Sequence, residues 1–110
     1  MNNIKFKQIA NEVINLEIQA LRKLKNSINR SFCDAVIKIA KCNSKIVMCG
    51  VGKSGIIASK IAATLASVGT PSFSMAASEA SHGDLGMISK KDILILLSYS
   101  GKTNELKNII

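Results

Sequence analysis

A short apolar run that ends in glycine constrains the fold of this chain more than any other feature. Residues 45–50 read Lys-Ile-Val-Met-Cys-Gly, and residues 50–55 read Gly-Val-Gly-Lys-Ser-Gly. A continuous apolar run of this length is typical of a strand that is buried on both faces of a sheet. A helix is predicted directly afterwards, over residues 54–68, because isoleucine or leucine recurs there at every fourth position. A buried strand followed by a glycine-rich turn and a helix favours an α/β fold with a parallel sheet.

The remainder of the αβ core, residues 45–110, supplies two more strands. Gly69 and Pro71 have the positions of residues that end a helix. The pattern then predicts strands over 70–75 and 92–98, a loop with one helical turn over 76–88, a turn over 98–103 and a helix over 104–110. We therefore expect a three-layer αβα sandwich with a parallel sheet, here reduced to about three strands.

Two helices are predicted before the core, within residues 4–41. In the first, Phe6, Ile9, Val13, Leu16 and Ala20 step by three and four residues, and a second apolar stripe lies beside them. A face this wide indicates a helix that packs on two sides, against its own domain and a partner subunit, or one that lies entirely within one core. The second helix is predicted from Ser31, as N-cap, to Lys41.

Length and composition exclude several classes of protein. A chain of 110 residues allows one domain, and 47% hydrophobic residues is too apolar for a disordered chain. The N-terminus carries Lys5, Lys7 and Glu12, which leaves no room for the apolar region of a signal peptide, and no apolar run is long enough to span a membrane. We expect a soluble protein of the cytoplasm.

Charge and cysteine content indicate neither a nucleic-acid partner nor a metal site. The net charge is +8, but only four aromatic residues accompany the cations, so nucleic-acid binding is not expected. Three cysteines without a CxxC pair, and the single His82, do not make a zinc site. We expect buried free thiols, no metal and no cofactor.

The loop at residues 50–55 has the composition of an anion site. It matches G-x-G-x-x-G between a strand and a helix, where glycines let the backbone approach an anion and the helix N-terminus contributes positive dipole. A Walker A loop is excluded because Val47 stands where its first glycine belongs. A dinucleotide site needs an acidic residue about 20 positions on, and the first one after the loop is Glu79. A phosphate-sized anion fits better.

A second loop of the same kind follows the third predicted strand. It reads Ser98-Tyr-Ser-Gly-Lys-Thr103, and its hydroxyls suit either an anion or ordinary helix capping. Loops at the carboxyl ends of parallel strands face one crevice, so the two loops together indicate one phosphorylated small molecule. Lys53 is read either as part of this site or as a solvated surface lysine; Glu105 and His82 likewise have structural as well as functional interpretations.

Four motifs in this order carry a family resemblance. They are Gly-Val-Gly-Lys-Ser-Gly at 50–55, Ser-Val-Gly-Thr-Pro-Ser at 67–72, Glu-Ala-Ser-His-Gly-Asp-Leu-Gly-Met at 79–87, and Ser-Tyr-Ser-Gly at 98–101. From about residue 8 onward the chain resembles the N-terminal half of the sugar isomerase (SIS) domain of the KpsF/GutQ family, the D-arabinose 5-phosphate isomerases. The resemblance implies a parallel sheet sandwiched by helices and assembly as a homo-oligomer, a tetramer in the family.

The resemblance also implies an activity and the residues for it. The family interconverts D-ribulose 5-phosphate and D-arabinose 5-phosphate on the route to Kdo, a lipopolysaccharide sugar, without a redox cofactor. The catalytic positions correspond to Lys53, His82 and Glu105. The positions that contact the sugar phosphate correspond to Ser54, Gly69, Thr70, Ser98, Ser100 and Thr103.

The chain departs from the family pattern in three respects. Ala76 and Ala77 stand where the family usually has His-Pro, and Lys102 replaces an acidic residue of the second loop. Residues 1–110 are expected to be a partial SIS domain, without its later strands and without the CBS domains that usually follow. Two further interpretations therefore remain: a non-catalytic phosphosugar-binding or regulatory module, and a gene remnant without a stable fold.

Overall fold

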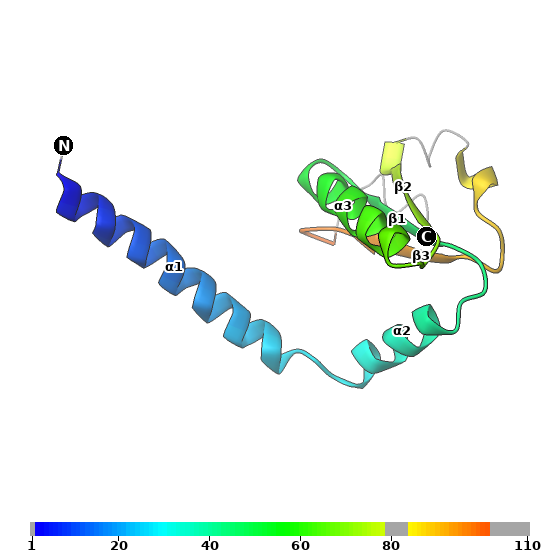
Figure 1. The fold of residues 1–110 in the computed structure, drawn as a ribbon, viewed down its shortest axis with the longest axis horizontal. Helices are drawn as coiled ribbons and strands as arrows, with labels where there is room; N and C mark the ends of the chain where they lie inside the picture. The colour runs from blue at the N-terminus through cyan, green and yellow to red at the C-terminus, as the bar shows by residue number, and fades with distance from the viewer. Residues whose placement is uncertain (1, 79–83, 102–110) are drawn as a thin grey trace. The chain divides into compact units, whose positions relative to one another are not determined.

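A computed structural model describes residues 2–78 and 84–101, whose helices and strands belong to two compact units (Figure 1). The units are Met1–Ile37 and Lys38–Ile110. The elements are α1 (Asn3–Asn26), α2 (Arg30–Ala40), β1 (Ile46–Gly50), α3 (Lys53–Ser67), β2 (Ser72–Ala76), a 3₁₀ turn η1 (Asp84–Met87) and β3 (Ile93–Leu97). The helix expected over 104–110 lies outside the described residues.

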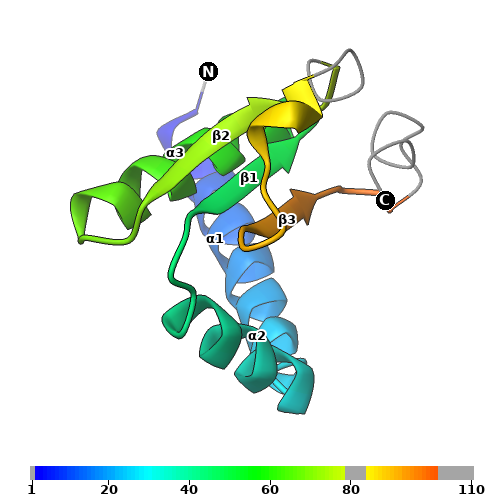
Figure 2. The same cartoon turned by 90° about the vertical axis from the view of Figure 1, so that its right-hand side faces the viewer.

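The second unit is built on a parallel sheet with the strand order β2-β1-β3 (Figure 2). Ile46 at the start of β1 is opposite Ser72 of β2 and Ile93 of β3, so all three strands begin at one edge and end at the other. The prediction of an α/β fold with a three-stranded parallel sheet is confirmed. The glycine-rich loop and the turn after β3 consequently share the carboxyl edge of the sheet.

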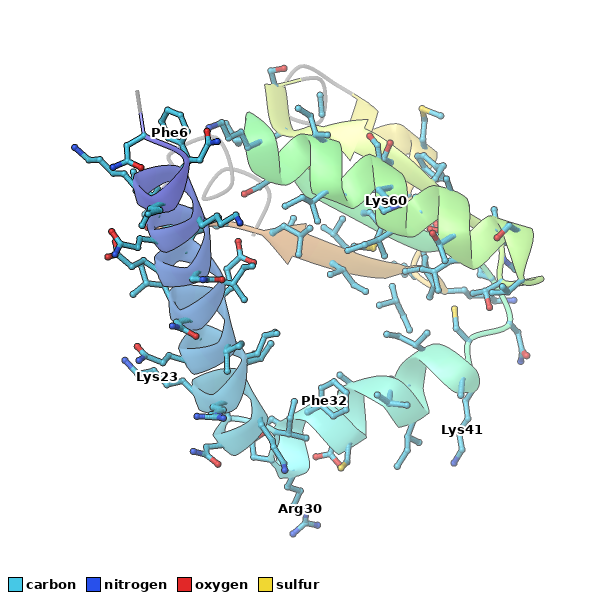
Figure 3. The ribbon with its side chains drawn as sticks, turned by 60° about the vertical axis from the view of Figure 1, so that its left-hand side comes forward. Phe6, Lys23, Arg30, Phe32, Lys41 and Lys60 are labelled. Carbon is cyan, nitrogen blue, oxygen red and sulfur yellow. The ribbon has the colours of Figure 1, made fainter. Side chains whose placement is uncertain are left out.

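The core lies on both faces of β1, every residue of which is buried. Ile46 and Met48 pack against Ala58 and Ala62 of α3, while Val47 and Cys49 face the other side, where Met75 and Ala77 pack. The two alanines keep α3 close to the sheet, and Figure 3 shows the apolar side chains between the helix and the sheet. A strand buried on both faces is what the unbroken apolar run predicted.

Helix α3 ends in a Schellman motif. The backbone N–H of Thr70 donates to the carbonyl of Leu65 (2.9 Å), the N–H of Gly69 donates to that of Ala66 (3.2 Å), and Gly69 has φ +94°. Because Gly69 and Thr70 are used in this cap, β2 begins at Ser72 rather than at the predicted residue 70.

The first unit contains α1, which begins at Asn3 and buries none of its residues. The side-chain oxygen of Asn2 accepts a hydrogen bond from the N–H of Ile4 (2.9 Å) and caps the helix. For α2 the prediction of Ser31 as N-cap is wrong. The side chain of Asn29 accepts from the N–H of Phe32 (3.2 Å), which moves the helix start to Arg30.

The three cysteines are free thiols, as expected, but not all are buried. Cys49 is buried in β1, which raises the pKa of its thiol, and Cys42 is half-buried. Cys33 is exposed, contrary to the prediction, because it lies on the first turn of α2, a helix with no buried residue. Over the described ranges 2–78 and 84–101, no helix is long and apolar enough to cross a membrane.

The sequence analysis missed a charge network at the amino edge of the sheet. The carboxylate of Asp92 is fully buried and accepts from Lys45 Nζ (2.8 Å), from the hydroxyl of Ser44 and from the N–H of Ser89 (2.8 Å). These bonds tie the residue before β3 to the residue before β1. Because all of them favour the ionised form, with the contact to Lys45 the largest cause, the pKa of Asp92 lies well below its ordinary value.

This network predicts how the stability of the chain depends on pH. A carboxyl whose pKa is lowered by folding stabilises the folded state at pH values above its unfolded pKa of about 3.9, and this contribution is lost as the pH falls further. We expect Asp92→Asn to lower the free energy of unfolding at pH 7 and the difference from wild type to shrink below about pH 4. Urea unfolding at a series of pH values from neutral down to about pH 3 measures it.

Asp34→Asn is the matched control, because Asp34 is exposed on α2. It should leave the free energy of unfolding unchanged within about 0.5 kcal/mol at each pH. A constant gap between Asp92→Asn and wild type across the pH series would contradict the assignment. The same curves test whether the chain unfolds cooperatively, which a remnant without a stable fold would not do.

Candidate functional site

The loop between β1 and α3 is a tight backbone turn. The N–H of Ser54 donates to the carbonyl of Val51 (3.1 Å), and the N–H of Gly55 donates to that of Gly52 (3.0 Å). Gly52 has φ +59°, a left-handed conformation that favours glycine. Gly50 allows the close approach, since a Cβ there would lie 2.7 Å from the backbone of Ser54. The strand end and the first turn of α3 are therefore in backbone contact.

This turn presents an uncompensated positive helix end. Gly52 is the N-cap of α3 and offers no side-chain acceptor, and the first turn of the helix contains no acidic residue. Lys53 is the first residue of α3 and is exposed. The helix dipole and the lysine charge thus act at one place, which favours binding of an anion.

The turn after β3 lies beside this loop at the carboxyl edge of the sheet. Its Ser98 hydroxyl accepts the N–H of Gly101 (2.8 Å), and Gly101 has φ +70°. A cavity of about 510 Å³ opens between the two loops, and we refer to it as the loop cavity. It is lined by Val51, Lys53, Ser54, Ile57 and Tyr99. Its volume lies within the range of small-molecule sites, roughly 300–1,000 Å³.

The structure brings part of the predicted site together. Lys53 and Ser54 line the loop cavity, and Ser98 and Ser100 lie in the turn that borders it, on either side of Tyr99. The sequence analysis gave Tyr99 no role. The position of Tyr99 between the two serines could have indicated that it lines the cavity, because residues in the turn after a parallel strand lie at the edge of the sheet where ligands bind.

Other predicted site residues lie away from the loop cavity or outside the residues that the structure describes. Gly69 and Thr70 are at the opposite end of α3, about 22 Å from Lys53 for a helix of 15 residues, so this chain does not bring them to the loop cavity. Their contact with substrate stays a prediction. His82, Thr103 and Glu105 lie outside the described residues.

A second, smaller cavity lies on the other side of the same turn. It measures about 280 Å³ and is lined by Gly50, Gly52, Gly55, Ile56, Ser59, Ser74, Met75 and Ala76. The hydroxyls of Ser59 and Ser74 are 2.9 Å apart and bond to each other. The cavity carries no charged side chain among these lining residues, so the loop cavity with Lys53 is the better candidate for an anion.

Fold and site define this protein first as an α/β domain with a cavity at the carboxyl edge of a parallel sheet. Comparison with known families gives the particular class. Residues 38–110 match the SIS domain, and the chain belongs to the SIS domain family. The matched segment coincides with the second compact unit, Lys38–Ile110.

Curated and solved relatives agree with this assignment. The chain is 46% identical over 107 residues to the arabinose 5-phosphate isomerase KdsD of Yersinia pestis, and 45% identical over 105 residues to KdsD of Escherichia coli K12. These matches cover 97% and 96% of this chain, but 33% and 32% of the relatives. The structure of E. coli CFT073 c3406 in complex with arabinose 5-phosphate matches with a TM-score of 0.91 and 43% identity, covering 99% of this chain and 58% of that one. The chain thus spans about a third of the length of the curated relatives it matches.

Proposed function

We propose that this chain is a phosphosugar-binding SIS domain whose loop cavity takes arabinose 5-phosphate or ribulose 5-phosphate. The observation that carries the proposal is the joint position of the positive end of α3, Lys53 and Ser54 in one cavity beside the turn of Ser98. The similarity to KdsD, and to a relative solved in complex with arabinose 5-phosphate, supports this choice of ligand.

The proposed chemistry is aldose–ketose isomerisation. A base removes the proton from C2 of the aldose and an enediolate forms. The hydroxyl proton passes from O2 to O1, and the base returns its proton to C1 to give the ketose, so no oxidant or cofactor is consumed. We assign the base to Glu105, assistance to His82, and stabilisation of the oxyanion or the phosphate to Lys53. Binding of the sugar phosphate is assigned to Ser54, Gly69, Thr70, Ser98, Ser100 and Thr103.

The proposal extends to partners and location. A small sugar phosphate and further copies of the chain are the proposed partners, with no nucleic acid, membrane or metal. We place the protein in the cytoplasm and its reaction on the route to lipopolysaccharide. In this proposal residues 4–41 are the helical extension of one SIS domain and residues 45–110 its αβ core.

The proposal is tested by ¹⁵N–¹H correlation spectra of the chain with and without arabinose 5-phosphate. We expect dispersed peaks, with ligand-induced shifts at residues 50–55 and 98–103. Glucose is the control ligand, because it presents hydroxyls without a phosphate. Absence of shifts at saturating arabinose 5-phosphate, in a chain with dispersed peaks, would contradict the proposal.

A turnover assay on the same sample separates the enzyme from the binding module. If the chain isomerises ribulose 5-phosphate, Glu105→Gln should abolish turnover and leave the ligand-induced shifts in place. Binding without turnover in wild type would identify the non-catalytic module. That second function is favoured by Ala76, which borders the smaller cavity at a position where the resemblance implies histidine.

A further inference from the structure

Tyr99 presents a bare aromatic ring at the loop cavity. Its exposed fraction is 102%, so no residue within 2–78 and 84–101 covers the ring, although the side chain lines the cavity. Glycine, proline and short polar residues dominate tight turns, each for a local backbone reason that does not apply to tyrosine. Neither the turn nor the packing of the described residues therefore accounts for an aromatic side chain at this position.

The residues that line the loop cavity divide into two chemical groups. Lys53 and Ser54 lie in the first turn of α3 and supply the polar groups for an anion. Val51, Ile57 and Tyr99 come from the loop after β1, from α3 and from the turn after β3, and we call them the apolar wall. Ile57, like Tyr99, is exposed, with an exposed fraction of 54%. The cavity therefore offers uncovered apolar surface beside its anion end.

A phosphate group alone fills only a small part of this cavity. The cavity measures about 510 Å³, whereas one water molecule takes about 30 Å³ of the liquid. When the phosphate is held at the positive end of α3, the remainder of the ligand lies against the apolar wall. A pentose 5-phosphate suits this division, because its carbon chain presents C–H groups between the hydroxyls. The electron-rich face of an aromatic ring attracts such C–H groups.

The backbone of the turn holds Tyr99 in place for this contact. The hydroxyl of Ser98 accepts the N–H of Gly101 (2.8 Å), which closes the turn around Tyr99. Gly101 has φ +70°, a left-handed conformation that fixes where the turn ends. A tyrosine side chain has only two torsion angles to immobilise, so packing its ring on a ligand costs little conformational entropy.

We propose that Tyr99 is a specificity-determining residue of the loop cavity, whose ring packs on the C–H face of the sugar while Lys53 and the end of α3 hold the phosphate. This inference rests on the proposed function and names the residue that distinguishes a sugar phosphate from phosphate alone. The ring makes the contact, and the phenolic hydroxyl is not required for it.

Titrations of the whole chain with arabinose 5-phosphate and with inorganic phosphate, followed by ¹⁵N–¹H correlation spectra, test the assignment. We expect Tyr99→Ala to raise the dissociation constant for arabinose 5-phosphate about tenfold and to leave that for inorganic phosphate within about twofold of wild type. Tyr99→Phe keeps the ring and should bind both ligands within about twofold of wild type. Lys53→Ala should weaken the binding of both, because both contain the phosphate.

Ile56→Ala is the matched control for the loss of an exposed apolar side chain. Ile56 has an exposed fraction of 72% and lines the smaller cavity, but not the loop cavity. Its replacement should leave both dissociation constants unchanged. Tyr99→Ala should also leave the free energy of unfolding unchanged in urea, since the ring makes no packing contact that the substitution removes.

The two ligands keep this inference separate from the proposed function. If wild type binds arabinose 5-phosphate and Tyr99→Ala binds it equally well, the role of Tyr99 is overturned and the proposed function stands. Equal losses for both ligands in Tyr99→Ala also overturn it, because the residue then acts at the anion end. A Tyr99→Phe variant as weak as Tyr99→Ala assigns the contact to the hydroxyl and overturns packing by the ring. A wild type that does not bind arabinose 5-phosphate contradicts the proposed function and, with it, this inference.

Discussion

Replacing Lys53 with alanine is expected to weaken binding of arabinose 5-phosphate by about ten- to hundredfold. Lys53 is the first residue of α3, lines the loop cavity and has no acidic neighbour in the first turn, so its charge is available to a ligand. A hydrogen bond to a charged group contributes about 1.5–3 kcal/mol, which corresponds to this change in affinity. The dissociation constant from isothermal titration calorimetry measures it.

Lys60→Ala is the matched control for this prediction. Lys60 is an exposed lysine on the same helix, two turns from Lys53 and not among the residues that line the loop cavity. Both substitutions remove one charge, so both reduce long-range attraction of an anion equally. Equal losses of affinity in the two variants would show that Lys53 acts only through net charge and would place the ligand elsewhere.

The sheet was predictable from the sequence because its residue pattern allows few other structures. Residues 46–50 are apolar without interruption, and both faces of β1 are buried by α3 on one side and Met75 and Ala77 on the other. Helix α3 was predictable because its apolar period and its terminal Gly69 agree. Where local pattern and packing give the same answer, sequence reasoning locates an element to within two residues.

The remaining features depend on contacts between segments far apart in sequence. Asp92 is 47 residues from Lys45, and nothing local to either residue predicts that they pair. Tyr99 was missed for a related reason, since it follows β3 and its place in the loop cavity depends on the distant turn that follows β1. Ser31 was misassigned as N-cap because Asn29 also has a side chain that can cap, and the choice between them depends on where the preceding turn ends.

The structure brings only part of the predicted site together, because its residues were predicted on two different grounds. Lys53, Ser54, Ser98 and Ser100 follow the carboxyl ends of parallel strands, and the topology alone brings such residues to one edge. Gly69 and Thr70 were carried over by resemblance, and they lie at the amino end of β2, where they close the Schellman motif. A contact between them and the same sugar phosphate therefore requires something other than this chain's own topology.

Replacing Gly50 with alanine is expected to lower the free energy of unfolding by about 1–3 kcal/mol. The new Cβ would lie 2.7 Å from the backbone carbon and oxygen of Ser54 and 2.8 Å from the backbone nitrogen of Gly55. Backbone atoms cannot rotate away as a flexible side chain can, so α3 must move away from β1. That movement separates Ile46 and Met48 from Ala58 and Ala62 and shifts Lys53 relative to the turn of Ser98.

Urea unfolding followed by circular dichroism measures this loss, with Gly86→Ala as the control. A Cβ at Gly86 meets no atom within 4 Å, so its free energy of unfolding should stay within about 0.5 kcal/mol of wild type. We also expect Gly50→Ala to weaken binding of arabinose 5-phosphate at temperatures where the variant is fully folded, since the same backbone contact positions the anion site. A variant as stable as wild type would mean that the first turn of α3 yields locally. Unchanged affinity in a destabilised variant would mean that the ligand does not depend on the contact between β1 and α3.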